Sequence, residues 1–171
     1  MGVHKRGVAF ARNIYDPTWS CKVDEGLAGL AHCRWAPSGR QILTISDMKL
    51  RLTIWNLVDQ TVQYIPCPKH EASGIDFNPD GSLMAVILKN ADDSLIDSGE
   101  NDGGDVVGLY NTKNENGSWD CLHRFCVGST QTADLKFTRD GAHLIVWDNP
   151  ITCSIQILQI TFGQRLIRYV R

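Results

Sequence analysis

The chain has 171 residues with 17 basic and 19 acidic side chains, for a formal net charge of −2 at pH 7. Its 43% hydrophobic and 21% charged residues are typical of a soluble globular protein, and so small a net charge favours neither nucleic acid nor a membrane surface as a partner. No run approaches the ~18 apolar residues of a membrane span, and the N-terminal apolar run is too short for a signal peptide. We therefore expect a cytoplasmic or nuclear protein.

Two stretches near the N-terminus predict strands. "VAFARNIYDP" (8–17) precedes "WSCKVDEG" (19–26), which is typical of the last strand of a sheet running into a loop. We expect residues 1–28 to form part of a four-stranded unit whose first two strands are missing.

Three short motifs then recur along the chain: "WAPSG" (35–39), "FNPDG" (77–81) and "FTRDG" (137–141). Each lies between an alternating run and a more continuous apolar run and ends in glycine, so each predicts a tight turn that joins two strands. The predicted third strands are 50–57, 105–112 and 154–160, and the predicted fourth strands are 60–66, 119–125 and 163–170. Four strands per unit, with 42 residues from Gly39 to Gly81 (81 − 39), match the blade of a β-propeller.

The predicted fold is all-β, a fragment of a WD-repeat β-propeller with about three four-stranded blades plus a partial N-terminal blade. The predicted units are 1–28, 29–72, 73–131 and 132–171. A blade buries both faces against its neighbours, so we expect apolar end faces that make the chain associate.

The dipeptide Trp147-Asp148 does not occupy the blade-closing position of a WD repeat. It follows Gly141 by only 6 residues and therefore belongs to the end of a second strand. At the end of the third strands stand Trp55-Asn56, Tyr110-Asn111 and Leu158-Gln159. We expect Asn56 and Asn111 to make the turn hydrogen bonds that an aspartate would make.

An acidic insertion, residues 91–105, separates the second and third strands of the third unit. Its acids, with no basic residue among them, are Asp92, Asp93, Asp97, Glu100, Asp102 and Asp105. Such a segment buries too little apolar area to offset its ordering entropy, so it predicts a mobile loop. It is either a binding patch for a basic segment of a partner protein or a solvated spacer.

Candidate metal and catalytic residues are sparse. Cys121, His123 and Cys126 fall within six residues, but no second ligand cluster completes a metal site, and we expect the six cysteines to be reduced thiols. Asp24 and Glu25 are adjacent on a strand and point to opposite faces, and no nearby histidine or serine completes a catalytic site. We therefore expect no enzyme activity, no catalytic residue, no metal, no cofactor and no small-molecule substrate.

Several stretches together resemble the spindle-pole and centrosomal WD-repeat protein family, the one encoded antisense to a p53-related gene in vertebrates. They are "PTWSCKVDEGLAG", "RWAPSGRQILT", "LRLTIWNL", "GIDFNPDGSLMA" and "LIVWDNP". The similarity runs from about Trp19 to Val170, while residues 1–15 and the acidic insertion depart from it. The resemblance implies a non-enzymatic propeller that anchors microtubule minus ends and tethers proteins at spindle poles, centrosomes or ciliary basal bodies. A subunit of a translation-initiation or RNA-processing complex is the alternative.

The candidate partner-binding residues lie along the 19–26 stretch and in the acidic insertion. They are Trp19, Lys22, Asp24, Glu25, Asp92, Asp93, Asp97, Glu100 and Asp102. We expect Trp35 and Trp55 to pack within the fold, and Trp19 and Trp119, at strand starts, to reach a partner.

Overall fold

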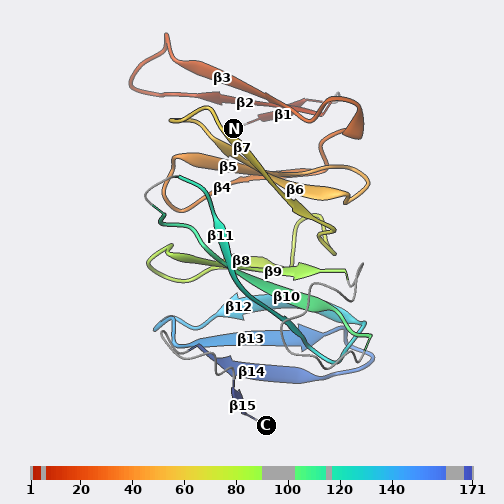
Figure 1. The fold of residues 1–171 in the computed structure, drawn as a ribbon. Coiled ribbons are helices and arrows are strands. Elements are labelled where there is room, and N and C mark those ends of the chain that lie inside the picture. The colour runs from red at the N-terminus through yellow and green to blue at the C-terminus, as the bar shows by residue number, and fades with distance from the viewer. Residues whose placement is uncertain (1, 5–6, 90–102, 115–116, 161–167, 171) are drawn as a thin grey trace. The chain divides into compact units, whose positions relative to one another are not determined.

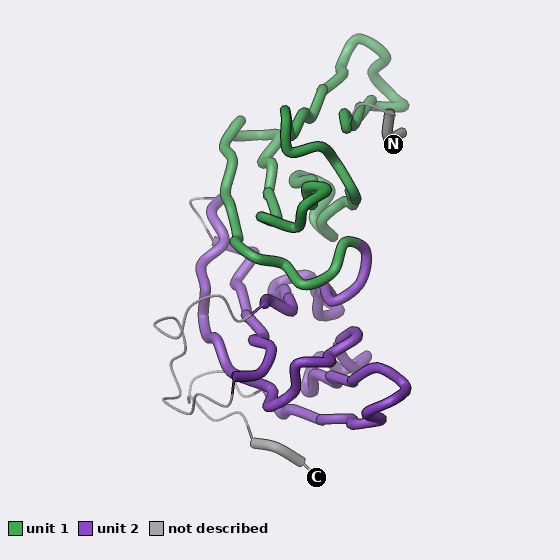
Figure 2. Tube along the Cα trace, turned by 90° about the vertical axis from the view of Figure 1, so that its right-hand side faces the viewer, with its two compact units in different colours: residues 1–71 green, residues 72–171 purple. Residues whose placement is uncertain are grey.

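The computed structural model describes residues 2–4, 7–89, 103–114, 117–160 and 168–170 (Figure 1). In these ranges every regular element is a β-strand except one turn of 3-10 helix, η1 (Gly26–Ala28). None of the helical structure in the described ranges is long and apolar enough to cross a membrane. The chain divides into two compact units, residues 1–71 and 72–171, which are described separately (Figure 2).

Unit 1 contains two antiparallel sheets. The first has the order β1-β2-β3, with β1 (Gly2–His4), β2 (Val8–Arg12) and β3 (Ser20–Asp24). The second has the order β4-β5-β6-β7, with β4 (His32–Trp35), β5 (Gln41–Ile45), β6 (Arg51–Asn56) and β7 (Val62–Pro66). The sequence predicted two strands before η1, and this was wrong by one, because Gly2–His4 also pairs with β2.

Unit 2 repeats the four-stranded plan twice. One sheet has the order β8-β9-β10-β11, with β8 (Ile75–Phe77), β9 (Leu83–Leu88), β10 (Val106–Asn111) and β11 (Asp120–Cys126). The other has the order β12-β13-β14-β15, with β12 (Thr132–Phe137), β13 (His143–Asp148), β14 (Ile155–Gln159) and β15 (Arg168–Val170). The all-β prediction is confirmed for the described residues. The third and fourth strands of both sheets lie within the stretches predicted for them or within one residue of them.

The three glycine motifs form the same turn. Gly39, Gly81 and Gly141 have φ values of 68°, 69° and 71°, a left-handed conformation that costs glycine little. The amide of each donates to the carbonyl three residues earlier, at 3.0, 2.9 and 2.9 Å. This common geometry explains why the motifs could be recognised as repeats of one structural unit.

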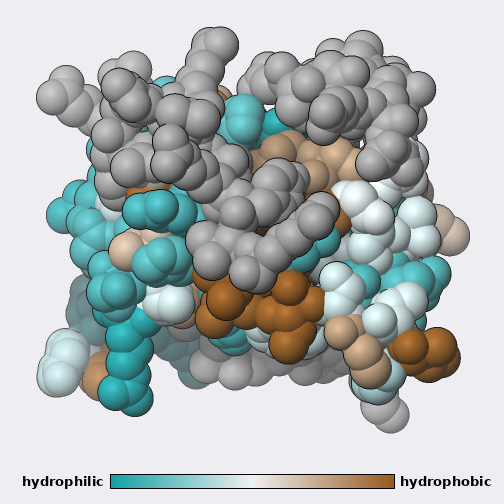
Figure 3. Space-filling view, turned by 90° about the horizontal axis from the view of Figure 1, so that it is seen from below, coloured by the Kyte–Doolittle hydropathy of each residue, from teal (hydrophilic) through white to brown (hydrophobic). Residues whose placement is uncertain are grey.

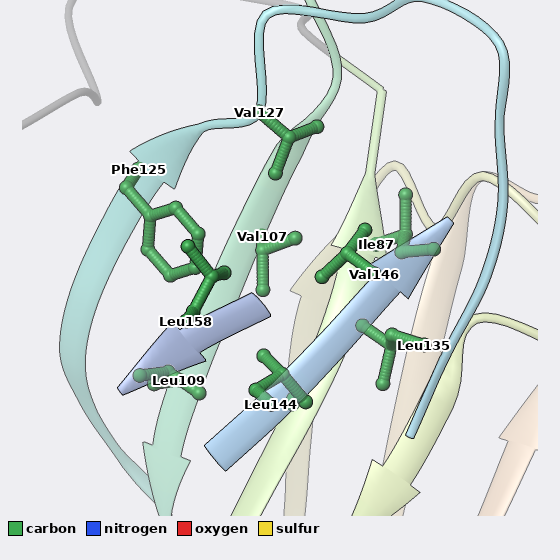
Figure 4. Packing of buried hydrophobic residues seen from close by; sticks show 10 residues of the cluster. Ile87, Val107, Leu109, Phe125, Val127, Leu135, Leu144, Val146 and Leu158 are labelled. Carbon is green, nitrogen blue, oxygen red and sulfur yellow. The ribbon is translucent and has the colours of Figure 1, made fainter. Parts of the chain in front are cut away.

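The core of unit 2 lies between its two sheets (Figure 4). One side is formed by residues of β9, β10 and β11, among them Ile87, Val107 and Phe125. The other side is formed by residues of β12, β13 and β14, among them Leu135, Leu144, Val146 and Leu158. Leu135 and Leu144 are 0% exposed, so this interface is closely packed.

Two carboxylates form hydrogen bonds between the same two sheets, at the first strand of each. Asp134 of β12 accepts a hydrogen bond from the Gly74 amide at 2.7 Å. Reciprocally, Asp76 of β8 accepts one from the Phe137 amide at 3.0 Å. Because buried backbone amides need partners, this exchange fixes the register of one sheet on the other.

The opposite face of the last sheet also carries apolar side chains. Ile155 and Ile157 of β14 are 68% and 37% exposed. Figure 3 views the molecule from below and shows hydrophobic side chains gathered on this side. The predicted association of the chain through such faces stays a prediction.

Two details of the sequence interpretation are confirmed. Trp147-Asp148 ends β13, the second strand of its sheet. Asn56 accepts hydrogen bonds from the Val58 and Asp59 amides at 3.0 and 3.2 Å, and Asn111 accepts one from the Lys113 amide at 3.1 Å. The asparagines therefore organise the turns after the third strands, as expected.

Asp105 differs from its prediction as part of a mobile acidic loop. The residue is 6% exposed, and its carboxylate accepts a hydrogen bond from the Thr132 amide at 3.1 Å. Its backbone bonds to Ser129 and Val127, at 2.7 and 3.0 Å. Asp105 is therefore a structural anchor of unit 2 and not a surface acid.

Candidate functional site

A pocket of about 300 Å³ opens between the two sheets of unit 1, and we call it the Trp19 groove. It lies between β3 on one side and the ends of β6 and β7 on the other. Its apolar lining consists of Trp19, Cys21, Val23, Trp55, Leu57 and Val62, and its polar lining consists of Ser20, Asn56, Gln60 and Thr61. Such an apolar pocket with a few polar groups is typical of a binding site.

Trp19 reaches the groove from the β2–β3 connection. The Trp19 amide donates to the Asp16 carbonyl at 3.1 Å, and its own carbonyl accepts from the Asn13 amide at 3.4 Å. The Asp16 carboxylate accepts from the amide and the hydroxyl of Thr18, at 3.0 and 2.5 Å, and these bonds, the hydroxyl first, lower the pKa of Asp16. The turn therefore holds Trp19, 38% exposed, beside an ionised carboxylate.

The β6–β7 connection forms the other wall. Besides the amides that it binds, Asn56 donates from Nδ2 to the Asp59 carboxylate at 2.7 Å. Val62, at the start of β7, is 41% exposed. The turn thus places a second carboxylate next to the lining residues Asn56 and Gln60.

A chain of hydrogen bonds holds Trp55 in place at the back of the groove. Its Nε1 donates to the Thr44 hydroxyl at 2.8 Å, and that hydroxyl in turn donates to the Glu25 carboxylate. Arg51 donates to the other carboxylate oxygen from Nη2 and Nε, at 3.0 and 3.4 Å, and its guanidinium lies 4.4 Å over the Tyr64 ring. A buried network whose members are satisfied is rigid, so the indole of Trp55 is held in one orientation.

The predicted site residues near β3 divide into three settings. Trp19 lines the groove. Lys22 and Asp24 are exposed and form an ion pair at 2.9 Å, and hydrogen bonds from Lys22 and then from the Gly26 amide lower the pKa of Asp24. The side chain of Glu25 is 0% exposed, so it has no surface for a partner and acts instead through Thr44 and Trp55. The opposite orientations expected for Asp24 and Glu25 are confirmed.

The predicted acidic patch cannot be placed. Asp92, Asp93, Asp97, Glu100 and Asp102 lie outside the described residues. Their role in binding stays a prediction.

The tryptophan assignments were wrong at two positions. Trp119 was expected to reach a partner, but it is 1% exposed and its ring packs edge-on against Phe77, with the centroids 5.9 Å apart. Trp35 was expected to pack, but it is 39% exposed. Strand alternation alone does not tell whether a side chain in an outer strand is covered by another part of the chain.

Sequence reasoning missed the contribution of Trp55, Leu57 and Val62 to the groove. Each was interpreted only as a strand residue. One signal was available in the sequence. The β2–β3 and β6–β7 connections each join the last two strands of neighbouring sheets of unit 1, and this equivalence brings the two connections to the same side.

The described residues show no metal-binding cluster. No three histidine, cysteine or acidic side chains among them are close enough to hold an ion, and the His123 ring stacks on Phe125 with centroids 5.9 Å apart. All six cysteines lie in the described part of the chain, and none forms a disulfide. Burial raises the pKa of the Cys33 thiol, which keeps it protonated.

Comparison with known proteins points to the WD-repeat class. A curated WD-repeat protein is similar over 166 residues, at 29% identity. That relative is the mouse protein named WD repeat-containing protein WRAP73, and the match covers 96% of this chain and 32% of the relative. The chain thus spans about a third of the length of the curated relative that it matches. No family model matches the chain.

Solved structures support the all-β architecture. One is the crystal structure of a putative 6-phosphogluconolactonase from Bacteroides fragilis, with a TM-score of 0.61 and 16% identity over 88% of this chain and 40% of that one. Another, from Bacteroides uniformis, has a TM-score of 0.58 and 15% identity over 95% of this chain and 46% of that one. At these identities the likeness shows the fold alone.

Proposed function

We propose that this chain is part of a non-enzymatic WD-repeat β-propeller that serves as a scaffold for other proteins at spindle poles, centrosomes or ciliary basal bodies. There it takes part in anchoring microtubules and organising the spindle. The observation that carries the proposal is the succession of three four-stranded sheets in which the same glycine turn joins the first strand to the second, together with the similarity to a WD-repeat protein over 96% of the chain.

The groove supports a role in binding and not in catalysis. Its lining contains two indoles and aliphatic side chains, and none of the described residues that line it is acidic, basic or a histidine. General acid–base chemistry needs such a group within hydrogen-bond reach of the substrate. Tryptophan, in contrast, is enriched among the residues that contribute most of the binding energy at protein interfaces.

Both solved structures are named as putative 6-phosphogluconolactonases, and a lactonase is therefore the enzymatic alternative to test, although their likeness to this chain shows the fold alone. Incubation of the full chain with 6-phosphogluconolactone tests it, and we expect no hydrolysis above the spontaneous rate. Hydrolysis that depends on the chain would replace the scaffold proposal with an enzymatic one.

Proximity labelling in dividing cells tests the scaffold proposal. The full chain fused to a biotin ligase should label spindle-pole and centrosomal proteins, with a freely diffusing ligase as the control. Labelling of ribosomal or RNA-processing proteins in their place would favour the alternative complex and reject the spindle-pole role.

A further inference from the structure

The Trp19 groove lies between two strands whose outer edges are open in the described residues. Both β3 and β7 are edge strands that pair with one neighbour each, β2 and β6. Unpaired amides and carbonyls on such edges can bond to an extended segment of another chain. The groove therefore suits a peptide in extended conformation better than a rounded small molecule.

The charges beside the groove favour a basic segment. Asp16 and Asp59 lie in the two turns that border it, and the backbone of Arg40 approaches it by accepting a bond from the Leu57 amide. These three residues carry a net charge of −1 (−2 + 1), so the segments that border the groove are slightly acidic. The basic side chains of the first sheet, Arg12 and Lys22, alternate with buried residues and so face the other side.

We propose that the Trp19 groove binds an extended segment of a partner protein, with a large apolar side chain between the two tryptophans and a lysine or arginine beside the flanking carboxylates. The inference rests on the scaffold function proposed above, because that function implies that the partner is a protein. It adds the site on this chain and the chemistry of the segment.

The groove is organised before a partner arrives. Trp55 is fixed through Thr44 and Glu25, and the turn hydrogen bonds fix the backbone of Trp19. Side chains that are already ordered lose less entropy on binding, so their contacts contribute more to affinity. Glu25 is thus a positioning residue for the groove and not a contact residue.

Fluorescence polarisation of labelled peptides on the full chain tests the proposal. The probe is a fluorescein-labelled decapeptide of alternating serine and threonine with a central leucine and a lysine on each side of it. Matched probes replace both lysines by glutamate, or the leucine by serine. The lysine–leucine probe should bind, and each replacement should weaken binding by about tenfold, the effect of losing one good contact.

Replacement of two tryptophans that are similarly exposed separates a wall of the groove from an exposed indole elsewhere. Trp19→Ala removes a wall of the groove, whereas Trp35→Ala removes an indole that is 39% exposed and does not line it. Trp19→Ala should lower the affinity for the lysine–leucine probe by about tenfold, and Trp35→Ala should leave that affinity unchanged. Asp59→Asn keeps a hydrogen-bond acceptor at this position. It should lower the affinity for the lysine–leucine probe and reduce the salt dependence of that affinity.

Equal binding by Trp19→Ala and wild type, or equal binding of the lysine and glutamate probes, would overturn the proposal. So would the absence of any binding to the wild-type chain. These outcomes of the peptide test do not affect the proximity-labelling test. Failure of the chain to label spindle-pole proteins would reject the scaffold function whether or not the probes bind.

Discussion

Replacement of Arg51 by methionine should destabilise unit 1 through the buried carboxylate of Glu25. That carboxylate is 0% exposed, and Arg51 is its only charged donor within the described residues. Methionine keeps most of the length and apolar surface of the stem, so the change removes mainly the charge. Thr44 remains as the single side-chain donor to Glu25.

The magnitude follows from the burial of the two partners. Breaking a fully buried pair costs about 3–5 kcal/mol, because one charge is left unpaired. The Arg51 side chain is 38% exposed, so water screens part of the interaction and we expect about 2 kcal/mol. The loss includes the stacking of the guanidinium on Tyr64, which contributes roughly 0.5–1 kcal/mol.

Urea unfolding of the full chain, followed by tryptophan fluorescence, measures this loss. Lys22→Met breaks an exposed pair and should leave the free energy of unfolding unchanged. Combining Glu25→Gln with Arg51→Met should cost clearly less than the sum of the single changes, because the double variant leaves no buried charge. Strict additivity, or a cost of Arg51→Met below about 0.5 kcal/mol, would refute the buried network.

Three further predictions concern packing, backbone and pH. Leu144→Ala, in the core of unit 2, should lower the free energy of unfolding by about 3 kcal/mol, and Ile155→Ala, 68% exposed, by less than about 0.5. Gly39→Ala should cost about 1 kcal/mol for its positive φ. Gly7→Ala, also at positive φ, should cost clearly more, because its methyl group would lie 2.7 Å from the backbone nitrogen of Leu30; thermal melts compare the two variants. Burial lowers the pKa of His32 below 6.5, so the unfolded chain takes up the proton first. Stability should therefore fall as the pH drops below about 6.5, and His32→Gln should reduce that fall in urea titrations at pH 7.5 and 5.5.

The repeating strands could be predicted because local chemistry specifies them. Glycine at a left-handed turn position, as at Gly81, and alternation between buried and exposed residues, as in β3, are properties of short segments. Asn56 was predicted for the same reason, since its hydrogen bonds lie within three residues.

The groove could not be predicted because it depends on contacts between segments distant in sequence. Trp19 and Trp55 come from different sheets, and Glu25 bonds Arg51 across 26 residues. Whether a tryptophan beside a strand is covered depends on distant residues. Trp119, just before β11, packs on Phe77 of β8, at the other edge of the same sheet, and for this reason it was misassigned. Tertiary packing, and not propensity, decides such cases.

The most direct measurement of how the chain binds other proteins is fluorine NMR of the full chain with 5-fluorotryptophan at its five tryptophan positions. Single tryptophan-to-phenylalanine variants assign the signals. On addition of the lysine–leucine peptide, the signals of Trp19 and Trp55 should shift while those of Trp35, Trp119 and Trp147 stay in place. A shift at Trp35 or Trp147, with Trp19 unchanged, would show that the segment binds elsewhere and contradict the assignment of the groove.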